Sequence, residues 1–415
     1  MSVFQLNDWW SVQVSTSNEE FDVGGLCVGN VDNADPPSDK IVVGSLGGFL
    51  RIYSPTRPGY RIEDLVIEED LGAPVLQVLM GKFIPSTESN GLAVLHPRKL
   101  AVYEVIPQGQ RDGPATYHTM RRVYEHVLGL EGGKHFTAFN MASGTFGGAK
   151  GREMIVVQSL DGKLQVFEQS ANAFTRQLVD CLLPGPLGYL SRLDAIVTAT
   201  SACQAECYRY QVLAASSSQA DAAGTTGAFG VSAVRNALME WSLNLGEPCR
   251  QIEEGSFLRA SVATNPTNNV PPTTPGGGKS APQEVLLLCD RSLFLLKESG
   301  GMIQQRRLEK EPCCFTKYAA GDAASANGPW HNFLLACRDG TLQVYSEFNL
   351  VWAAKLPMSS SSSSSAASSA TAVSAPVPVQ VPPLAHRSPL GSLPLSPPPC
   401  PCRSPWRSSG TSAAW

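Results

Sequence analysis

The stretch that decides the fold reads Ile155-Val156-Val157-Gln158-Ser159-Leu160-Asp161-Gly162-Lys163-Leu164-Gln165-Val166-Phe167. An apolar run comes first, an Asp-Gly turn follows, and apolar residues then alternate with polar ones. Asp-Gly between two β-rich runs is a strong hairpin signal, because these residues accept the positive φ of a tight turn. The stretch therefore predicts two antiparallel strands, the first covered on both faces and the second alternating between a covered and an open face.

The same hairpin pattern recurs along the chain. It returns from Ile41 to Tyr53, with Gly-Gly at the turn, and from Phe333 to Tyr345, with Asp-Gly. Shorter versions run from Leu92 to Tyr103 and from Val285 to Leu296, and a divergent copy runs from Ala195 through Cys207 to Leu213. Each hairpin is flanked by two further strand-like segments, of which the clearest are 64–68, 75–79, 122–126 and 239–243. The repeating unit therefore has four strands.

The spacing of these units predicts the fold class. They begin near residues 24, 74, 135, 186, 247 and 312. A four-stranded unit that recurs every ~40 to 50 residues is typical of a β-propeller. A β-sandwich would explain the strands but not the repeated hairpin, and the scarcity of helical patterns argues against a helical solenoid. We predict an all-β propeller domain over residues 1–357 with six recognisable four-stranded blades.

Three segments do not fit the repeat. Residues 214–236 and 259–283 are rich in small residues, Pro and Gly, and we expect flexible surface loops there. Residues 358–415 contain a serine run and eleven prolines, with no strand or helix periodicity. We expect this Ser/Pro-rich tail to be disordered.

Composition excludes several classes of function. Only 16% of the 415 residues are charged and the formal net charge is −4, so no basic stripe for nucleic acid is present. Residues 1–357 carry 29 basic and 36 acidic side chains and are more acidic than the whole chain. No apolar run reaches the ~18 residues of a membrane span, and the N-terminus lacks the features of a signal peptide. We expect a soluble cytoplasmic protein without nucleic acid or small-molecule substrate.

The cysteines and glycine-rich segments do not predict a cofactor or metal site. Most of the eleven cysteines lie in apolar runs without zinc spacing, which favours reduced thiols. Gly276–Ser280 superficially resembles a phosphate-binding loop, but Thr273 stands where such a loop needs glycine, and no strand leads into a helix. Residues 143–151 favour a tight connection between two strands. We assign no cofactor-binding and no metal-binding residue.

No catalytic constellation is present either. The nucleophile motif Gly-x-Ser-x-Gly is missing, and the histidines that precede the tail are scattered at His96, His118, His126, His135 and His331. Asp161 and Asp339 fit turn positions, since Asp-Gly turns need them. We assign no catalytic residue and expect a protein that is not an enzyme.

One acidic cluster has two readings. It comprises Glu63, Asp64, Glu68, Glu69 and Asp70. The cluster could face a basic partner, but on the outer strand of a blade it is more simply a charged edge that prevents strand-to-strand aggregation.

Several segments, in order and with their spacing, resemble the N-terminal domain of the parathyroid-hormone-responsive family, also called Bardet–Biedl syndrome protein nine. They are Asn7-Asp8-Trp9-Trp10, Glu20-Phe21-Asp22, Asn30-Val31-Asp32-Asn33, Asp39 to Ser45, Leu92 to His96, Gly144 to Gly148, Asp161 to Gln169 and Leu183 to Leu187. The resemblance covers about residues 1 to 356. It implies a seven-bladed propeller in a core subunit of the BBSome, a coat-like complex that carries membrane proteins to and from cilia. The implied partners are other BBSome subunits, with membrane association only through the complex. The implied locations are the cytoplasm, cilium, ciliary membrane and basal body.

The chain departs from this family after residue 356. In the family, the strand that corresponds to Leu350–Leu356 is followed by the rest of blade seven, where this chain has its Ser/Pro-rich tail. The segment Asn7–Val12 resembles the strand that closes the ring by joining the last blade. We therefore expect an incomplete last blade, an imperfectly closed ring and an aberrant tail.

Two rival functions remain open. A propeller enzyme would need acids or histidines repeated on the innermost strands, and these strands read as apolar. A scaffold of another coat or trafficking complex would have the same fold. Fold alone does not choose between scaffolds, because function depends on sites placed on the fold.

Overall fold

The computed structural model describes residues 9–14, 19–85, 87–108, 117–129, 136–178, 184–215, 239–258, 283–320 and 330–356. All of them belong to one unit, Met1–Val377. Of the predicted loops 214–236 and 259–283, only residues 214–215 and 283 are described. The predicted tail 358–415 lies outside the described residues entirely.

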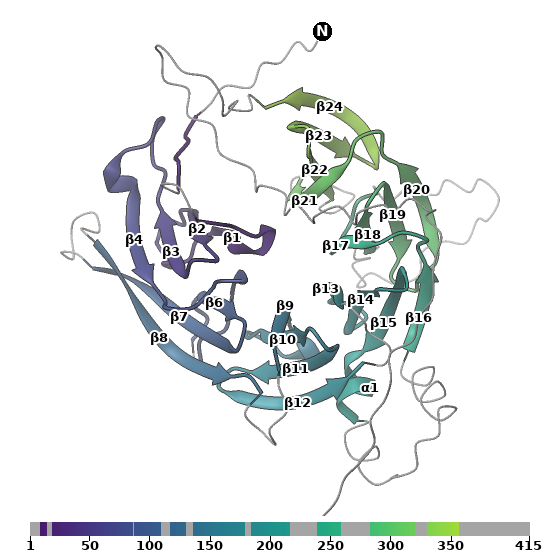
Figure 1. Cartoon of the computed structure of the whole chain (residues 1–415), viewed down its shortest axis with the longest axis horizontal. Coiled ribbons are helices and arrows are strands. Elements are labelled where there is room, and N and C mark those ends of the chain that lie inside the picture. The colour runs from purple at the N-terminus through teal and green to yellow at the C-terminus, as the bar shows by residue number, and fades with distance from the viewer. Residues whose placement is uncertain are drawn as a thin grey trace, which may run out of the picture. The chain divides into compact units, whose positions relative to one another are not determined.

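The described residues form six four-stranded antiparallel sheets, here called blades 1 to 6 (Figure 1). In every sheet the strands follow one another in chain order. Blade 1 comprises β1 (Leu26–Gly29), β2 (Lys40–Gly44), β3 (Phe49–Tyr53) and β4 (Leu65–Asp70), and blade 2 comprises β5 (Gln77–Gly81), β6 (Gly91–His96), β7 (Lys99–Gln108) and β8 (Tyr117–Val127). Blade 3 comprises β9 (Ala138–Gly144), β10 (Met154–Ser159), β11 (Lys163–Glu168) and β12 (Ala171–Gln177), and blade 4 comprises β13 (Pro184–Leu190), β14 (Ala195–Thr200), β15 (Gln204–Arg209) and β16 (Met239–Asn244). Blade 5 comprises β17 (Cys249–Gly255), β18 (Glu284–Cys289), β19 (Ser292–Lys297) and β20 (Met302–Arg307), and blade 6 comprises β21 (Pro312–Ala319), β22 (His331–Cys337), β23 (Thr341–Ser346) and β24 (Asn349–Lys355).

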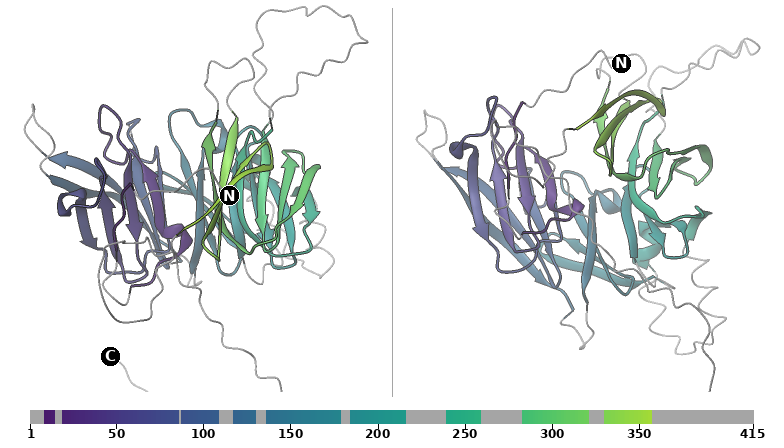
Figure 2. Two further views of the ribbon diagram at one scale, coloured as in Figure 1. Left: turned by 90° about the horizontal axis from the view of Figure 1, so that it is seen from above. Right: turned by 45° about the horizontal axis from the view of Figure 1, so that its top comes forward.

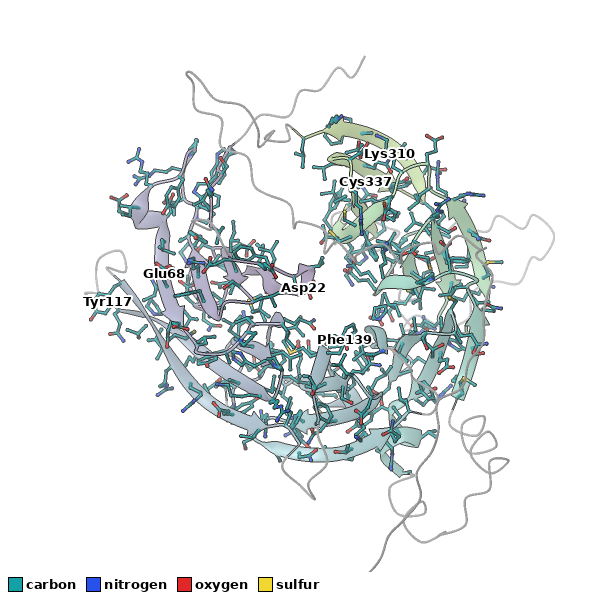
Figure 3. All side chains as sticks on the ribbon, in the orientation of Figure 1. Asp22, Glu68, Tyr117, Phe139, Lys310 and Cys337 are labelled. Carbon is teal, nitrogen blue, oxygen red and sulfur yellow. The ribbon has the colours of Figure 1, made fainter. Side chains whose placement is uncertain are left out.

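The all-β propeller with six recognisable blades is confirmed. The first strand of each blade lies toward the middle of the ring and the fourth lies outside, and the strands run from one rim to the other (Figures 1 and 2). In Figure 3, Asp22 and Phe139 lie toward the middle, whereas Glu68 and Tyr117 lie at the outer side. Every described blade, including the last, has four strands.

The hairpins have the burial pattern and the turn conformation that the sequence predicts. In blade 3, every residue of β10 is buried, whereas β11 alternates. The turn between them places Gly162 at φ 78°, and the matching turn of blade 6 places Gly340 at φ 77°. Ser159 and Asp161 are hydrogen-bonded to each other in the turn, and the Ser159 Oγ accepts the Lys163 N–H at 2.9 Å. Asp161 is therefore a turn residue, as predicted.

Packing between blades produces the core. Five apolar clusters join consecutive blades, one at each boundary from blades 1 and 2 to blades 5 and 6. The innermost strands follow the same path, with β1 packed on β5, β5 on β9, β9 on β13, β13 on β17 and β17 on β21. Among the described residues, no comparable packing joins β21 to β1.

The divergent repeat was predicted wrongly at its end. The hairpin copy was expected to run to Leu213, but β15 ends at Arg209 and a short helix, α1 (Tyr210–Ala215), follows. Tyr210 stacks on Phe146 at 5.6 Å, and Leu213 is buried beside it in the cluster between blades 3 and 4. These contacts stabilise a helical turn, because a helix places Tyr210 and Leu213 on the same side. Ala214 and Ala215, predicted as loop, complete this helix.

Candidate protein interface

One face of blade 6 is incompletely covered. In blades 2 to 5, every residue of the second strand is buried, so both faces of each sheet are covered. In β22 of blade 6, by contrast, Phe333, Leu335 and Cys337 are buried but Leu334 and Ala336 between them are not. The buried set packs on blade 5. Because successive strand residues point to opposite faces, Leu334 and Ala336 lie on the face turned away from blade 5.

The uncovered face of blade 6 continues across its neighbouring strands. Leu334 is paired with Val344, and Val344 with Trp352; Ala336 is paired with Leu342. All of these side chains are only partly buried. The Nε1 of Trp352 is shielded from solvent and has no hydrogen-bond partner in the part of the chain that the structure describes. Shielded donors are normally paired, so this indole N–H is consistent with a missing acceptor on this side. We call this surface the free face of blade 6.

Blade 1 has a matching free face. Val42, Leu50 and Ile52 are buried against blade 2, whereas the alternate residues of the same two strands, Ile41 and Val43 on β2 and Phe49 and Arg51 on β3, are only half-buried. The same face of the sheet continues onto β1, where Leu26 is paired with Val43 and Val28 with Ile41. Leu26 and Val28 are 57% and 56% exposed. The first and last blades thus each present one apolar face that no other blade of the described residues covers.

Part of the free face of blade 1 is occupied by the N-terminal segment. The Trp10 ring packs on Tyr53 and Tyr60, with centroids 5.7 and 6.0 Å away, and its Nε1 donates to Asp64 Oδ2 at 2.9 Å. Nearby, the Gly59 N–H donates to the Trp9 carbonyl at 2.8 Å. The expected ring-closing strand Asn7–Val12 is therefore wrong for its described part: residues 9–14 contain no strand and are anchored to blade 1 instead. Asn7 and Asp8 lie outside the described residues.

Arg51 is the charged centre of this face. Its guanidinium binds both carboxylate oxygens of Glu19 at 2.7 and 3.1 Å and one oxygen of Glu68 at 2.8 Å. Burial opposes the charge, but these two carboxylates raise the pKa of Arg51. Burial beneath Trp10 also raises the pKa of Tyr53 to about 12. A bidentate Arg–carboxylate pair of this kind orients both partners, so Glu19 is held in place on blade 1.

The acidic cluster divides into two parts. Glu68, Glu69 and Asp70 lie exposed at the end of outer strand β4, as predicted for a charged edge, and the exposed Glu63 precedes that strand and pairs with Arg57 at 3.6 Å. Asp64 does not belong to that edge, because it is buried and accepts the N–H groups of both Trp10 and Arg61.

The histidines serve separate structural contacts. His96 is buried with Nδ1 at 2.9 Å from the Pro74 carbonyl, His118 Nε2 lies 3.0 Å from Asp32 Oδ2, and His126 stacks on Phe167. His331 accepts the Ser256 N–H at 3.2 Å. His96, His118 and His126 lie at separate positions of blade 2 and His331 lies in blade 6, and His135 is outside the described residues. The structure brings none of the four described histidines together.

The innermost strands differ from expectation in one blade. They were expected to be apolar, but β17 of blade 5 carries Glu253 and Glu254. Glu254 Oε1 accepts the hydroxyl of Ser191 in blade 4 at 2.6 Å, and burial raises the pKa of Glu253. The other five innermost strands of the described blades carry no carboxylate. Among the described blades, acidic residues on the innermost strand thus occur in blade 5 alone.

The other sequence motifs have simple locations. Residues 143–151 connect β9 to β10 through a short 3₁₀ turn at Phe146–Gly148, as predicted. Gly276–Ser280 lies outside the described residues. Within the described ranges, no group of three potential ligands is arranged to hold a metal, the eight cysteines are free thiols, and no helix has the length and apolarity to cross a membrane.

Sequence reasoning expected an imperfectly closed ring but did not identify the residues of the two free faces. The run Phe333–Cys337 is as apolar as the corresponding runs of blades 2 to 5, so composition alone gives no sign that one side lacks a neighbour. The available signals were the count of six blades and the departure from the resembled family after residue 356, and neither indicates which side chains are uncovered.

Comparisons with known proteins agree with this architecture. A family model described as PTHB1 N-terminal matches residues 1–372. Protein PTHB1 of Xenopus laevis is 40% identical over 360 residues, which cover 86% of this chain and 38% of that protein. Protein PTHB1 of Homo sapiens is 39% identical over 361 residues, which cover 86% of this chain and 37% of that protein. The chain thus spans less than two fifths of the length of these relatives.

Solved structures support the fold. A crystal structure of BBS1N in complex with ARL6DN matches with a TM-score of 0.55 at 12% identity, over 80% of this chain and 82% of the matched one. At that identity the match bears on the fold alone.

Proposed function

The chain belongs to the PTHB1 N-terminal family, and from that premise we propose that it is a non-enzymatic scaffold subunit of the BBSome. Its relatives at about 40% identity are named PTHB1, which is the parathyroid-hormone-responsive family that the sequence resembles. A propeller of the same fold, BBS1N, forms a complex with ARL6DN. In this role the blades provide a rigid surface for protein partners, which are other BBSome subunits.

The observation that carries the proposal is the pair of free apolar faces on blades 1 and 6. Leu26 and Val28 are exposed on blade 1, the apolar residues of the blade 6 face are partly buried, and apolar surface left uncovered in this way is typical of places where protein binds. We place a further β-sheet between the two faces, which would make the ring seven-bladed, with a seventh blade that the described residues do not supply. The unpaired Trp352 N–H supports a neighbour on that side.

The proposed working environment follows from the same role. The protein acts in the cytoplasm and at the cilium and basal body, and it reaches the ciliary membrane only through the complex. Its task there is the trafficking of membrane proteins to cilia.

Native purification from ciliated cells tests the proposal. The tagged full chain is compared with a free-face variant, V43D/L334D, and with a matched control, V127D/M302D. Val127 and Met302 are 53% and 56% exposed on outer strands β8 and β20, so the control adds the same charge without touching either free face. Circular dichroism first establishes that all three proteins are folded.

We expect mass spectrometry to find BBSome subunits with the wild-type chain and the control, and several-fold less with the free-face variant. Recovery of no BBSome subunit, or of another coat complex in their place, contradicts the proposed assembly. Equal recovery by both variants contradicts the assignment of the free faces as the interface.

A further inference from the structure

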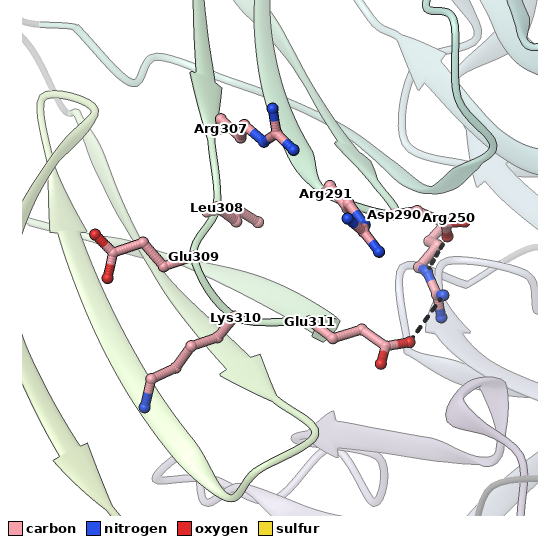
Figure 4. Close-up of a pocket in the computed structure, with 8 residues that line it drawn as sticks. All are labelled: Arg250, Asp290, Arg291, Arg307, Leu308, Glu309, Lys310 and Glu311. Carbon is pink, nitrogen blue, oxygen red and sulfur yellow. Dashed lines mark hydrogen bonds and ion pairs between the residues drawn. The ribbon is translucent and has the colours of Figure 1, made fainter.

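A second surface with unused binding groups lies at the rim between blades 5 and 6. A cavity of about 710 Å³ opens there and is lined by Arg250, Asp290, Arg291, Arg307, Leu308, Glu309, Lys310 and Glu311 (Figure 4). The buried Leu308 belongs to the apolar cluster between the two blades. The charged residues come from the start of β17, the β18–β19 turn, and the end of β20 with its connection to β21, so three separate chain segments meet at this pocket.

Most charges of this rim pocket neutralise one another. Arg250 binds Asp290 at 2.6 Å and Glu311 at 3.5 Å, and Glu311 also binds Arg338 at 3.1 Å. Lys310 binds Asp339 at 2.7 Å. The hydrogen bond from Lys310 has the largest effect on the pKa of Asp339, that from Thr341 the next largest, and together they lower this pKa to about 2.

Two arginines remain without a carboxylate partner. The side chains of Arg291 and Arg307 form no ion pair within the described residues, although the Arg291 backbone N–H donates to Glu247 at 2.7 Å. They are neighbours, because Arg307 is paired with Ser292 and the Leu308 N–H donates to the Arg291 carbonyl at 2.7 Å. Figure 4 shows both guanidinium groups directed to the same side, whereas Glu309 points away from them. Two neighbouring guanidinium groups without a carboxylate partner repel each other, and a bound anion would relieve this repulsion.

We propose that this rim pocket binds an acidic segment of a protein partner, with Arg291 and Arg307 as the residues that hold its carboxylates. Guanidinium groups form short, paired hydrogen bonds with carboxylates, and here neither group has such a bond already. The cavity is within the size range that takes several residues of a peptide rather than a single small anion.

This inference rests on the proposed scaffold function in one respect, which is that the binding partner is a protein. Its site is distinct from the free faces of blades 1 and 6. Binding at the pocket is measured directly with purified chain, so this inference and the BBSome assembly can fail independently.

The test is fluorescence anisotropy with a labelled octaglutamate peptide and the full chain at low and at physiological salt. The variant is R291Q/R307Q, which removes the two charges with little change in size. The matched control is R121Q/R122Q on outer strand β8, where both arginines are exposed and paired with glutamates. A labelled octalysine peptide and vesicles containing phosphatidylserine complete the set.

We expect the wild type and the control to bind octaglutamate, with weaker binding as salt rises, and the variant to lose about tenfold or more in affinity. Octalysine should not bind. The inference is overturned if octaglutamate does not bind the wild type, if the variant binds as tightly as the control, or if the variant loses binding to anionic vesicles while octaglutamate binding is absent. The last result would assign the pocket to a membrane surface instead.

Discussion

Gln77 and Met141 exchange two hydrogen bonds across the boundary between blades 2 and 3. The Gln77 Nε2 donates to the Met141 carbonyl at 2.9 Å, and the Met141 N–H donates to Gln77 Oε1 at 2.7 Å. Gln251 and Phe315 repeat this arrangement between blades 5 and 6, at 2.8 and 2.9 Å. Separate sheets share no backbone ladder, so an amide side chain supplies the missing donor and acceptor and fixes one blade against the next.

Replacing Gln77 by alanine should therefore destabilise the propeller. The change leaves both backbone groups of Met141 without these partners, and we expect the free energy of unfolding to fall by about 1–3 kcal/mol. Urea denaturation followed by circular dichroism measures the change. Gln304→Ala on outer strand β20 is the control, because Gln304 is exposed. Equal losses in the two variants would argue against a stabilising role for the two hydrogen bonds between Gln77 and Met141.

The two adjacent tryptophans should differ sharply in their effect on stability. Trp10 packs on Tyr53 and Tyr60 and donates to Asp64, whereas Trp9 is 54% exposed. We expect Trp10→Ala to cost about 2 kcal/mol, which is below the ~3–5 kcal/mol of a fully buried tryptophan, because Trp10 is only partly covered. Trp9→Ala should stay within about 0.5 kcal/mol of wild type. Chemical denaturation compares them, and a similar cost for both would show that the N-terminal segment is not anchored through Trp10.

His96 should make stability depend on pH. Burial lowers the pKa of His96, nearby Lys99 adds to this effect, and the Pro74 and Ala73 carbonyls only partly oppose it. Below the ordinary histidine pKa of ~6.5, the unfolded chain binds a proton that the folded chain does not, so the free energy of unfolding falls as pH falls.

His96→Asn removes the titrating group, and the asparagine amide can still donate to the Pro74 carbonyl. We expect the stability difference between wild type and H96N to be larger at pH 7.5 than at pH 5.5, measured by urea denaturation at each pH. The remaining groups are common to both proteins and cancel. A difference that does not change with pH would contradict the assignment.

Trp352 should tolerate loss of its indole N–H better than Trp241 does. The Trp241 Nε1 donates to the Glu298 carbonyl at 2.8 Å, whereas the shielded Trp352 Nε1 has no partner among the described residues. Trp241→Phe should cost about 1 kcal/mol or more, and Trp352→Phe should cost less or even stabilise the isolated chain, because no hydrogen bond is lost. Thermal unfolding measures both. A larger loss for Trp352→Phe would mean that its N–H is already paired.

Local chemistry made the blades predictable from sequence. The hairpin at Ile155–Phe167 requires only a buried strand and a turn residue that accepts positive φ, and both signals are local. The expected unit starts near 24, 74, 135, 186, 247 and 312 lie within about three residues of the first strands, from Leu26 to Pro312. The helix at Tyr210–Ala215 was missed because its stability comes from Phe146 and the cluster beside it, which are distant in the chain.

The sites were less predictable, because they depend on what lies opposite a side chain. The sequence around Leu334 and Leu335 does not distinguish the covered residue from the half-covered one, since both belong to one apolar run. Trp10 and Asp64 are 54 positions apart in the sequence, so their hydrogen bond, which holds the segment expected as the strand Asn7–Val12 on blade 1, could not be predicted from local sequence. Arg291 and Arg307 are ordinary turn and strand-end arginines in sequence, and only the sheet register makes them neighbours.

The central claim is that blades 1 and 6 each present an uncovered face, and adjacent leucines of β22 test it most directly. Leu335 is fully buried against blade 5, whereas Leu334 lies on the free face. The measurement is the free energy of unfolding of L334A and L335A, by urea denaturation of the full chain. We predict that L335A loses about 2–5 kcal/mol, as in a packed core, and that L334A loses less than about half as much. Equal losses would show that another part of the protein already covers this face and would contradict the account.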